Sequence, residues 1–217
     1  MFIIEKEPKS IAAESYRTLR TNIQYSSFDK EYRVIVVTSS EPGEGKSTTS
    51  GNLALSMAQG DKRVILIDCD LRKPSLHKKI KLSYLVGLSD VIIGKADLVT
   101  AVHKYNKNLV ILTSGKIPPN PAEMLSSKAM GNLLETLKQN FDYIILDTPP
   151  VQAVTDSQIL STKADGTILV VRAERTKKDS VQNAINLLKK VNANIIGTVL
   201  NGVEASRNKY YYYYGDK

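Results

Sequence analysis

The residues with the clearest chemical potential form a glycine-rich segment, residues 39–49, with the sequence Ser-Ser-Glu-Pro-Gly-Glu-Gly-Lys-Ser-Thr-Thr. The segment follows an apolar run and precedes a helical pattern, which is the context that a phosphate-binding loop requires. Gly43 and Gly45 let the backbone approach phosphate oxygens, and the N–H groups of the loop and of the helix start carry partial positive charge. This pattern predicts a nucleotide site.

Within this loop, Lys46 is expected to reach the β- and γ-phosphates of ATP, and the Ser47 hydroxyl is expected to bind Mg²⁺. Such loops usually begin with Gly, whereas this one begins with Ser40, so its first turn must tolerate a side chain. ATP and Mg²⁺ are therefore the predicted ligands. The predicted binding residues of the loop are Gly43, Glu44, Gly45, Lys46, Ser47 and Thr48.

Two further apolar runs of the sequence end in carboxylates. Asp68 and Asp70 follow the first run, and Asp147 follows the second, directly ahead of two prolines. If the chain stays extended, Asp68 and Asp70 point to the same side and Cys69 to the other. Carboxylate oxygens are ligands that Mg²⁺ prefers, so these acids stand where Mg²⁺ and the γ-phosphate are expected, and Asp147 should hold the metal directly or through water, together with Ser47. The alternative for each acid is a strand-end turn or a helix cap.

The elements that must position these residues alternate between strand and helix. Short apolar runs rich in Val and Ile predict strands, and because their apolarity is continuous, helices should cover both faces of the sheet. The predicted strands are residues 34–37, 64–67, 109–112, 143–146, 167–171 and 195–200, and the predicted helices are residues 47–59, 121–139 and 180–190. The second helix has Asn120 placed as N-cap, Pro121 at its first position and Glu123 as the reciprocal cap partner. We expect a doubly wound, mainly parallel α/β fold of the P-loop NTPase type, with ligands at the carboxyl ends of the strands.

The 217 residues suit one large α/β domain with a shorter segment at each end. Residues 1–30 are expected to be an N-terminal helical segment, packed on the domain or linking subunits, with an amphipathic stretch at residues 9–25. Residues 31–207 form the nucleotide-binding domain, and residues 208–217 form a tail. The tail contains five adjacent tyrosines, Tyr210, Tyr211, Tyr212, Tyr213 and Tyr214. Such a run cannot alternate into a core, so we expect a flexible tail that is either an interaction patch or, beside a phosphate loop, a phosphorylation site.

The composition excludes several classes of protein. No apolar stretch approaches the roughly 18 residues of a membrane span, and the N-terminus lacks the apolar core of a signal peptide, so a cytoplasmic chain is expected. Cys69 is the only cysteine of the sequence, which rules out an internal disulfide and a thiolate metal cluster. The net charge is +8. Because runs of charge are usually solvated, a solvated face with phosphate-binding residues is favoured over a surface that binds an acidic protein segment, anionic lipid or nucleic acid. No nucleic-acid partner is expected, because no recognition motif accompanies the charge. The basic clusters are Arg72, Lys73, Lys78, Lys79 and Lys81, then Arg172, Arg175, Lys177 and Lys178.

Together these features resemble the bacterial tyrosine kinases that govern capsular and extracellular polysaccharide synthesis, in the free-standing cytoplasmic form found in Gram-positive bacteria. The resemblance covers nearly the whole chain and is carried by residues 41–49, 65–72 and 147–150 and by the tyrosine run. Partition and septum-site ATPases share the first three motifs. The partition-type ATPases, however, carry a second lysine, used across a nucleotide-sandwich dimer, where this chain has Glu41. A tyrosine kinase is therefore favoured over a partition-type ATPase switch and over a nucleotide-binding scaffold without catalysis.

The resemblance also implies roles for individual residues. Asp68 would orient or deprotonate the incoming tyrosine hydroxyl, with Lys46 and Asp70 completing the catalytic set. Asp70 and Asp147 would also lie around the Mg²⁺. Asn201 would contact the adenine, although Asn201 and the glycine after it also form an ordinary turn dipeptide. Arg72 is either a phosphate contact or a plain surface arginine.

Assembly and partners are further implications of the resemblance. Glu14, Arg17 and Arg20 lie at three-residue steps and would join subunits into a ring, the alternative being an i,i+3 ion pair on a solvated face. The tail tyrosines would then be phosphorylated in trans by a neighbouring subunit. The implied partners are a membrane adaptor, which activates the kinase and holds it at the membrane periphery, and a phosphotyrosine phosphatase.

Overall fold

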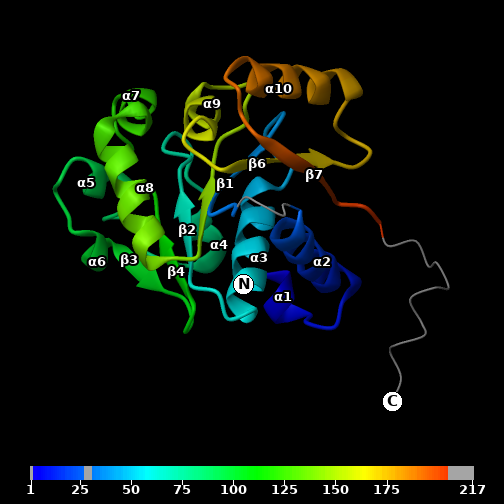
Figure 1. The fold of residues 1–217 in the computed structure, drawn as a ribbon, viewed down its shortest axis with the longest axis horizontal. Helices are drawn as coiled ribbons and strands as arrows, with labels where there is room; N and C mark the ends of the chain where they lie inside the picture. The colour runs from blue at the N-terminus through cyan, green and yellow to red at the C-terminus, as the bar shows by residue number, and fades with distance from the viewer. Residues whose placement is uncertain (1, 27–30, 205–217) are drawn as a thin grey trace.

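A seven-stranded sheet forms the centre of the computed structural model, which describes residues 2–26 and 31–204 (Figure 1). The strands are β1 (Val34–Ser39), β2 (Val64–Asp68), β3 (Val102–Lys104), β4 (Leu109–Leu112), β5 (Tyr143–Asp147), β6 (Gly166–Arg172) and β7 (Ile195–Asn201). Their order is β3-β4-β2-β5-β1-β6-β7, and every neighbouring pair is parallel except the edge pair β3–β4. The predicted doubly wound, mainly parallel fold is confirmed, whereas the tyrosines at 210–214 lie outside the described residues.

The strand order brings three loops to one point of the sheet. β1 lies between β5 and β6, and the chain runs from β1 toward β2 and β4 before it returns through β5 to β6 and β7. The direction of winding therefore reverses beside β1. In open α/β sheets, ligands bind at such a reversal, in the crevice at the carboxyl ends of the strands. The loops that follow β1, β2 and β5 are the predicted phosphate loop and the two acidic segments.

Helices cover both faces of this sheet, as the continuous apolarity of the strands predicts (Figure 1). The helices are α1 (Ile3–Lys6), α2 (Ile11–Tyr25), α3 (Lys46–Gln59), α4 (Leu76–Ile80), α5 (Leu88–Ile92), α6 (Leu98–Ala101), α7 (Pro121–Ser126), α8 (Lys128–Asn140), α9 (Asp156–Ser161) and α10 (Lys178–Lys190). Ile35 and Val37 of β1 join the buried cluster under α1–α4, while Val34 and Val36 join the cluster under α5–α9. A smaller cluster joins α10 to β6. Within the described ranges, no helix combines the length and the apolarity that a membrane crossing requires.

The single helix predicted at residues 121–139 is wrong. Two helices, α7 and α8, occupy this stretch, because Ser127 is extended (ψ 158°) and its side chain caps α8 by accepting the Met130 N–H at 3.2 Å. Pro121 begins α7 as predicted, but the Asn120 side chain makes no capping hydrogen bond, so the expected reciprocal cap with Glu123 does not form. Six short elements escape prediction because they have neither a helical period nor a continuous apolar run, namely α1, β3, α4, α5, α6 and α9.

The N-terminal segment packs on α3, the helix that follows the phosphate loop. Phe2 and Ile4 are buried, and the Ile4 N–H donates to Asn52 Oδ1 at 3.2 Å. The Phe2 ring lies against Gly51, where an added Cβ would come within 2.0 Å of the ring. Asn52 Nδ2 in turn donates to the Thr48 carbonyl oxygen at 2.8 Å. The first residues of the chain are therefore joined to the first turn of α3.

Replacing Phe2 by Ala should lower the free energy of unfolding by about 3 kcal/mol, because a buried aromatic ring is removed from a packed site. Tyr25→Ala is the matched control, since Tyr25 is 78% exposed, and it should change stability by less than about 0.5 kcal/mol. Urea unfolding followed by circular dichroism measures both. Equal losses in the two variants would show that Phe2 does not pack on α3 in solution.

Candidate nucleotide and catalytic site

The loop between β1 and α3 has the backbone shape that its glycines allow. Gly43 and Gly45 adopt φ values of +81° and +99°, in the left-handed region that residues with side chains rarely enter. Ser40 is buried but lies outside that region, so the turn tolerates its side chain as expected. Helix α3, 14 residues long, starts at Lys46. A glycine-rich loop that opens a helix in this way is suited to bound phosphate.

Glu44 stabilises the loop itself. Its carboxylate is buried and accepts hydrogen bonds from the Glu41 N–H at 2.9 Å and from the Thr176 hydroxyl. A contact between Glu44 and a nucleotide would therefore come from its backbone. From the end of β7, Asn201 Nδ2 donates to the Glu44 carbonyl oxygen at 2.9 Å. This bond holds Asn201 at the loop, and its contact with adenine stays a prediction.

Two buried acids face each other across neighbouring strands. In the parallel pair β2–β5, Asp68 is the register partner of Asp147, and the Cys69 N–H donates to the Asp147 carbonyl oxygen at 2.8 Å. Both side chains are almost completely buried. Burial, followed by the charge of Asp147, raises the pKa of Asp68 well above its ordinary value.

Asp68 is fixed in place by backbone donors. Its Oδ1 accepts the Asp70 N–H at 3.2 Å, and its Oδ2 accepts the Leu76 N–H at 3.1 Å. A carboxylate accepts about four hydrogen bonds, so each oxygen keeps acceptor capacity. An oriented carboxylate with a raised pKa is suited to act as a general base near neutral pH.

Asp147 has the properties of a metal ligand. Its Oδ1 is buried and has no hydrogen-bond partner among the described residues. Burial raises the pKa of Asp147 to about 6, opposed by the Ser47 hydroxyl and then by the charge of Lys46. A buried acceptor without a donor is costly unless a ligand reaches it. These surroundings fit a cation beside Asp147 and Ser47.

The residues around Asp147 fit Mg²⁺ in particular. Mg²⁺ usually takes only one or two carboxylates and fills its other positions with water and phosphate oxygens. The site therefore suits a metal that arrives with a nucleotide.

Lys46 lies among the acids of the site. Burial lowers the pKa of its ammonium group, while the charges of Asp147, Asp70 and Glu44 raise it. The structure thus brings Lys46, Asp70 and Asp147 together beside the phosphate loop, and Asp68 joins them through its position opposite Asp147.

The same-side placement expected for Asp68 and Asp70 stays a prediction. β2 ends at Asp68, the Cys69 N–H still bonds to β5, and the chain bends only from Leu71 onward. The Asp70 N–H donates to the Asp68 carboxylate at 3.2 Å. The Asp70 carboxylate accepts the Lys73 N–H at 2.9 Å, which makes the strand-end turn that was the alternative for this residue. Asp70 still lies close enough to influence Lys46 and Asp147 electrostatically.

The residues after this turn cover the start of α3. The Ser75 hydroxyl lies 3.1 Å from the Ser47 hydroxyl, and Lys79 Nζ donates to the Thr48 hydroxyl at 3.2 Å. Ser75 escapes sequence analysis because a lone serine carries no motif. Lys79 appears in the sequence only as one member of a basic cluster.

Arg72 is neither free nor a plain surface arginine. Its Nε and Nη2 donate to the two carboxylate oxygens of Asp156 at 2.9 and 3.0 Å, and the Asp156 side chain is fully buried at the start of α9. This bidentate pair joins the loop after β2 to α9. Losing Arg72 would leave a buried carboxylate without a partner.

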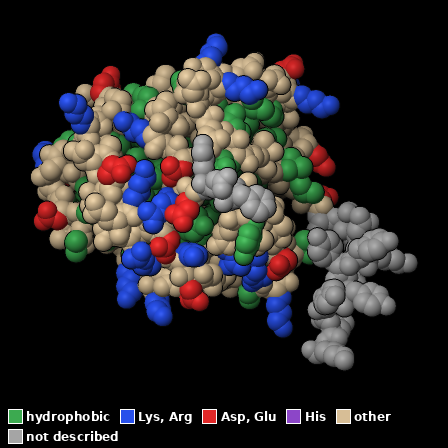
Figure 2. Space-filling view, in the orientation of Figure 1, with side chains coloured by type: hydrophobic (Ala, Val, Ile, Leu, Met, Phe, Trp, Pro, Cys, Tyr) green, Lys and Arg blue, Asp and Glu red, His purple; other side chains and the backbone are tan. Residues whose placement is uncertain are grey.

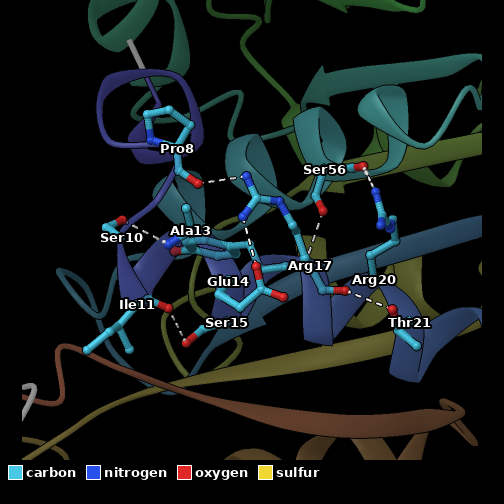
Figure 3. A network of polar contacts seen from close by, with 11 residues as sticks. Pro8, Ser10, Ile11, Ala13, Glu14, Ser15, Arg17, Arg20, Thr21 and Ser56 are labelled. Atoms are coloured by element: carbon cyan, nitrogen blue, oxygen red, sulfur yellow. Dashed lines mark hydrogen bonds and ion pairs between the residues drawn. The ribbon is translucent and has the colours of Figure 1, made fainter. Parts of the chain in front are cut away.

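The amphipathic stretch predicted at residues 9–25 is helix α2, which packs on α3. Arg17 donates to the Glu14 carboxylate and to the Pro8 carbonyl oxygen, each at 2.8 Å (Figure 3). Arg20 donates instead to the Ser56 carbonyl oxygen of α3 at 2.7 Å. The i,i+3 ion pair is therefore present within one subunit, and the role of the three residues between subunits stays a prediction.

The basic cluster after β2 is exposed to solvent. Lys73, Lys78, Lys79 and Lys81 are exposed, and Figure 2 shows Lys and Arg side chains interspersed with Asp and Glu on the face that it displays. Interspersed charges of both signs are typical of a solvated face.

The phosphate loop after β1, the helix that it opens and the acids at the ends of β2 and β5 define a P-loop NTPase of the mainly parallel α/β class. The AAA domain family matches residues 32–200. The chain is 46% identical over 212 residues to the tyrosine-protein kinase YwqD of Bacillus subtilis (strain 168), covering 97% of this chain and 90% of that protein. The kinase domain of the Escherichia coli tyrosine kinase ETK superposes with a TM-score of 0.90 at 32% identity, over 99% of this chain and 85% of that one. The chimerical protein CapA2B2 gives a TM-score of 0.88 at 38% identity, over 92% and 88%.

The chain belongs to the bacterial tyrosine-protein kinases. It also shares its fold with the septum site-determining protein MinD of Pyrococcus horikoshii, with a TM-score of 0.67 at 24% identity, a likeness that shows the fold alone. The prediction of a tyrosine kinase is thus confirmed over the alternative of a partition-type ATPase switch.

The raised pKa of Asp147 predicts a pH-dependent stability. Because this pKa is about 6 in the folded chain and near 3.8 otherwise, the folded state binds the proton more tightly, and stability without nucleotide falls as pH rises from about 4 to 6. Asp147→Asn removes this loss and should be more stable than the wild type at pH 8, by on the order of 2 kcal/mol.

Urea unfolding at pH 5 and pH 8, without nucleotide or Mg²⁺, measures this difference. Asp97→Asn is the control, since Asp97 is exposed, and its stability should follow the wild type at both pH values. An Asp147→Asn variant without any advantage at pH 8 would show that the Asp147 carboxylate is not desolvated.

Proposed function

We propose that the enzyme transfers the γ-phosphoryl group of ATP, bound with Mg²⁺, to the hydroxyls of residues 210–214 of a neighbouring subunit, and so regulates the synthesis and export of capsular or extracellular polysaccharide. The observation that carries the proposal is the register of Asp68 with Asp147 beside Lys46. This register supports the proposal, because phosphoryl transfer needs a base and a metal ligand close to the bound phosphates. The acceptor assignment rests on the five adjacent tyrosines of the sequence.

Each residue's task follows from its surroundings. Asp68 accepts the proton of the tyrosine hydroxyl while that oxygen bonds to the γ-phosphorus and the bond to the β–γ bridging oxygen breaks. Lys46 and the loop N–H groups hold the β- and γ-phosphates and stabilise the charge on the leaving oxygen. Ser47, Asp70 and Asp147 hold Mg²⁺, whose charge further offsets that of the phosphates when it is bound. The MinD structure of the same fold is described as a complex with Mg-ADP, which supports this pair of ligands.

A membrane adaptor and a phosphatase complete the proposal. The chain spans 28% of the tyrosine-protein kinase ptk of Acinetobacter johnsonii and 28% of the putative tyrosine-protein kinase EpsB of Ralstonia nicotianae, so those proteins carry further segments beyond the kinase. In this system, a separate adaptor of the polysaccharide co-polymerase type activates the kinase and holds it at the membrane periphery. A phosphotyrosine phosphatase reverses the modification.

Incubation with ATP and MgCl₂, followed by mass spectrometry, should locate phosphate on residues 210–214. Lys46→Met should reduce this labelling at least about 100-fold, because the cation that stabilises the transferring phosphoryl group is lost. Lys62→Met is the matched control, since Lys62 is exposed in the loop between α3 and β2, and it should label as the wild type does. A wild-type enzyme that consumes ATP without ever forming phosphotyrosine would refute the proposed function.

The proposed ring of subunits, joined through Glu14, Arg17 and Arg20, has its own test. Arg20→Glu should give monomers by light scattering and at least about tenfold weaker autophosphorylation, because reversing a charge at an interface opposes association. Since Arg20 also binds the Ser56 carbonyl oxygen, the free energy of unfolding is measured alongside. Folded Arg20→Glu protein that still forms rings would rule out this interface.

A further inference from the structure

The loop between β6 and α10 is fastened to the phosphate loop. The Thr176 hydroxyl donates to the Glu44 carboxylate, and the Ser180 hydroxyl donates to the Glu41 carboxylate. Thr176 Oγ1 also accepts the Arg172 N–H at 3.0 Å, which fixes the start of the loop. One contact from the loop and one from the first turn of α10 therefore hold this segment against the phosphate loop.

This fastening places the Arg175 guanidinium at Gly43. A Cβ built on Gly43 would lie 3.2 Å from Nη1, 3.6 Å from Nη2 and 3.7 Å from Cζ of Arg175. In the part of the chain that the structure describes, no ion pair joins Arg175 to an acid. Arg72, by comparison, is bound by a buried carboxylate. Arg175 is thus a cation held at a phosphate-binding loop without an anionic partner from the protein.

Glu41 of the phosphate loop takes part in this fastening. Its carboxylate accepts the hydrogen bond from the Ser180 hydroxyl in the first turn of α10. Both ends of this contact therefore help to position the segment that carries Arg175.

We propose that Arg175 contacts the phosphate chain of the bound nucleotide from the outer side of the phosphate loop. The inference rests on the nucleotide site of the proposed function and adds a binding residue to it. A guanidinium suits this role because its planar fork donates two parallel hydrogen bonds to phosphate oxygens, whereas an ammonium acts as a point charge. Gly43 leaves no side chain between the guanidinium and the loop. The competing explanation is a solvated arginine that rests on Gly43 without touching the ligand.

Nucleotide affinity separates the two explanations without relying on turnover. Equilibrium dialysis of the full chain against labelled ATP and labelled ADP, with Mg²⁺, gives Kd for each. Arg175→Gln should weaken ATP binding about 10- to 100-fold, the range expected for charge-assisted hydrogen bonds. Arg175→Lys should recover only part of this loss, because the bidentate geometry is gone. A loss confined to ATP assigns the contact to the γ-phosphate, and a loss for both nucleotides assigns it to the inner phosphates.

Lys177→Gln is the matched control, because it removes the same charge two residues away on the same loop, where Lys177 is exposed. Its Kd should stay within about twofold of the wild type, since an exposed charge is screened. Equal, small changes in Arg175→Gln and Lys177→Gln would overturn this inference alone. A lower free energy of unfolding for nucleotide-free Arg175→Gln would also overturn it, by showing a structural role. A wild-type chain that binds no nucleotide would overturn the proposed function as well.

Discussion

Two carboxylates buried opposite each other impose the main constraint on this structure. Asp68 and Asp147 are register partners on β2 and β5, and both side chains are almost fully excluded from solvent. Burying two acids side by side disfavours their charged forms, as the raised pKa of each shows. Backbone donors satisfy Asp68, whereas Asp147 relies on Lys46 and Ser47 and keeps one oxygen without a donor. The protein alone leaves this arrangement incomplete, and a cation that arrives with phosphate would complete it.

The surrounding elements hold the phosphate loop and its helix in position relative to these acids. Asn52 joins the N-terminal segment to the first turn of α3, and Asn201 binds the loop from β7. Ser75 contacts the helix start from the segment after β2, and Thr176 binds the loop from the β6–α10 turn. Groups far apart in sequence therefore hold the loop and the start of α3 from four directions. Such preorganisation is what phosphoryl transfer requires, since its catalysis is mostly positioning and electrostatic stabilisation.

The features that the sequence predicts are those with a local cause. Glycines beside Lys46, continuous apolar strands and acids at strand ends are each visible within a few residues, and they give the fold class and the candidate site. The pairing of Glu44 with Thr176 joins residues 132 positions apart and has no local signal. Ser127 breaks the predicted helix because its side chain caps α8 in preference to continuing α7. The hydrogen bond from the Asp70 N–H to the Asp68 carboxylate likewise escapes strand periodicity, because it joins a side chain to the backbone.

The burial of Asp68 also affects when a tyrosine can reach the candidate base. Asp68 is 0% exposed, so a tyrosine hydroxyl cannot reach its carboxylate until the residues that cover it move. The backbone N–H groups of Asp70 and Leu76 are hydrogen-bonded to this carboxylate. Asp70 lies in the segment between β2 and α4, and Leu76 is the first, buried residue of α4, which also carries the exposed Lys78 and Lys79. A partner or neighbouring subunit that shifts this segment would expose the base and the phosphates together. Access to Asp68, rather than nucleotide binding alone, would then decide whether a tyrosine is phosphorylated.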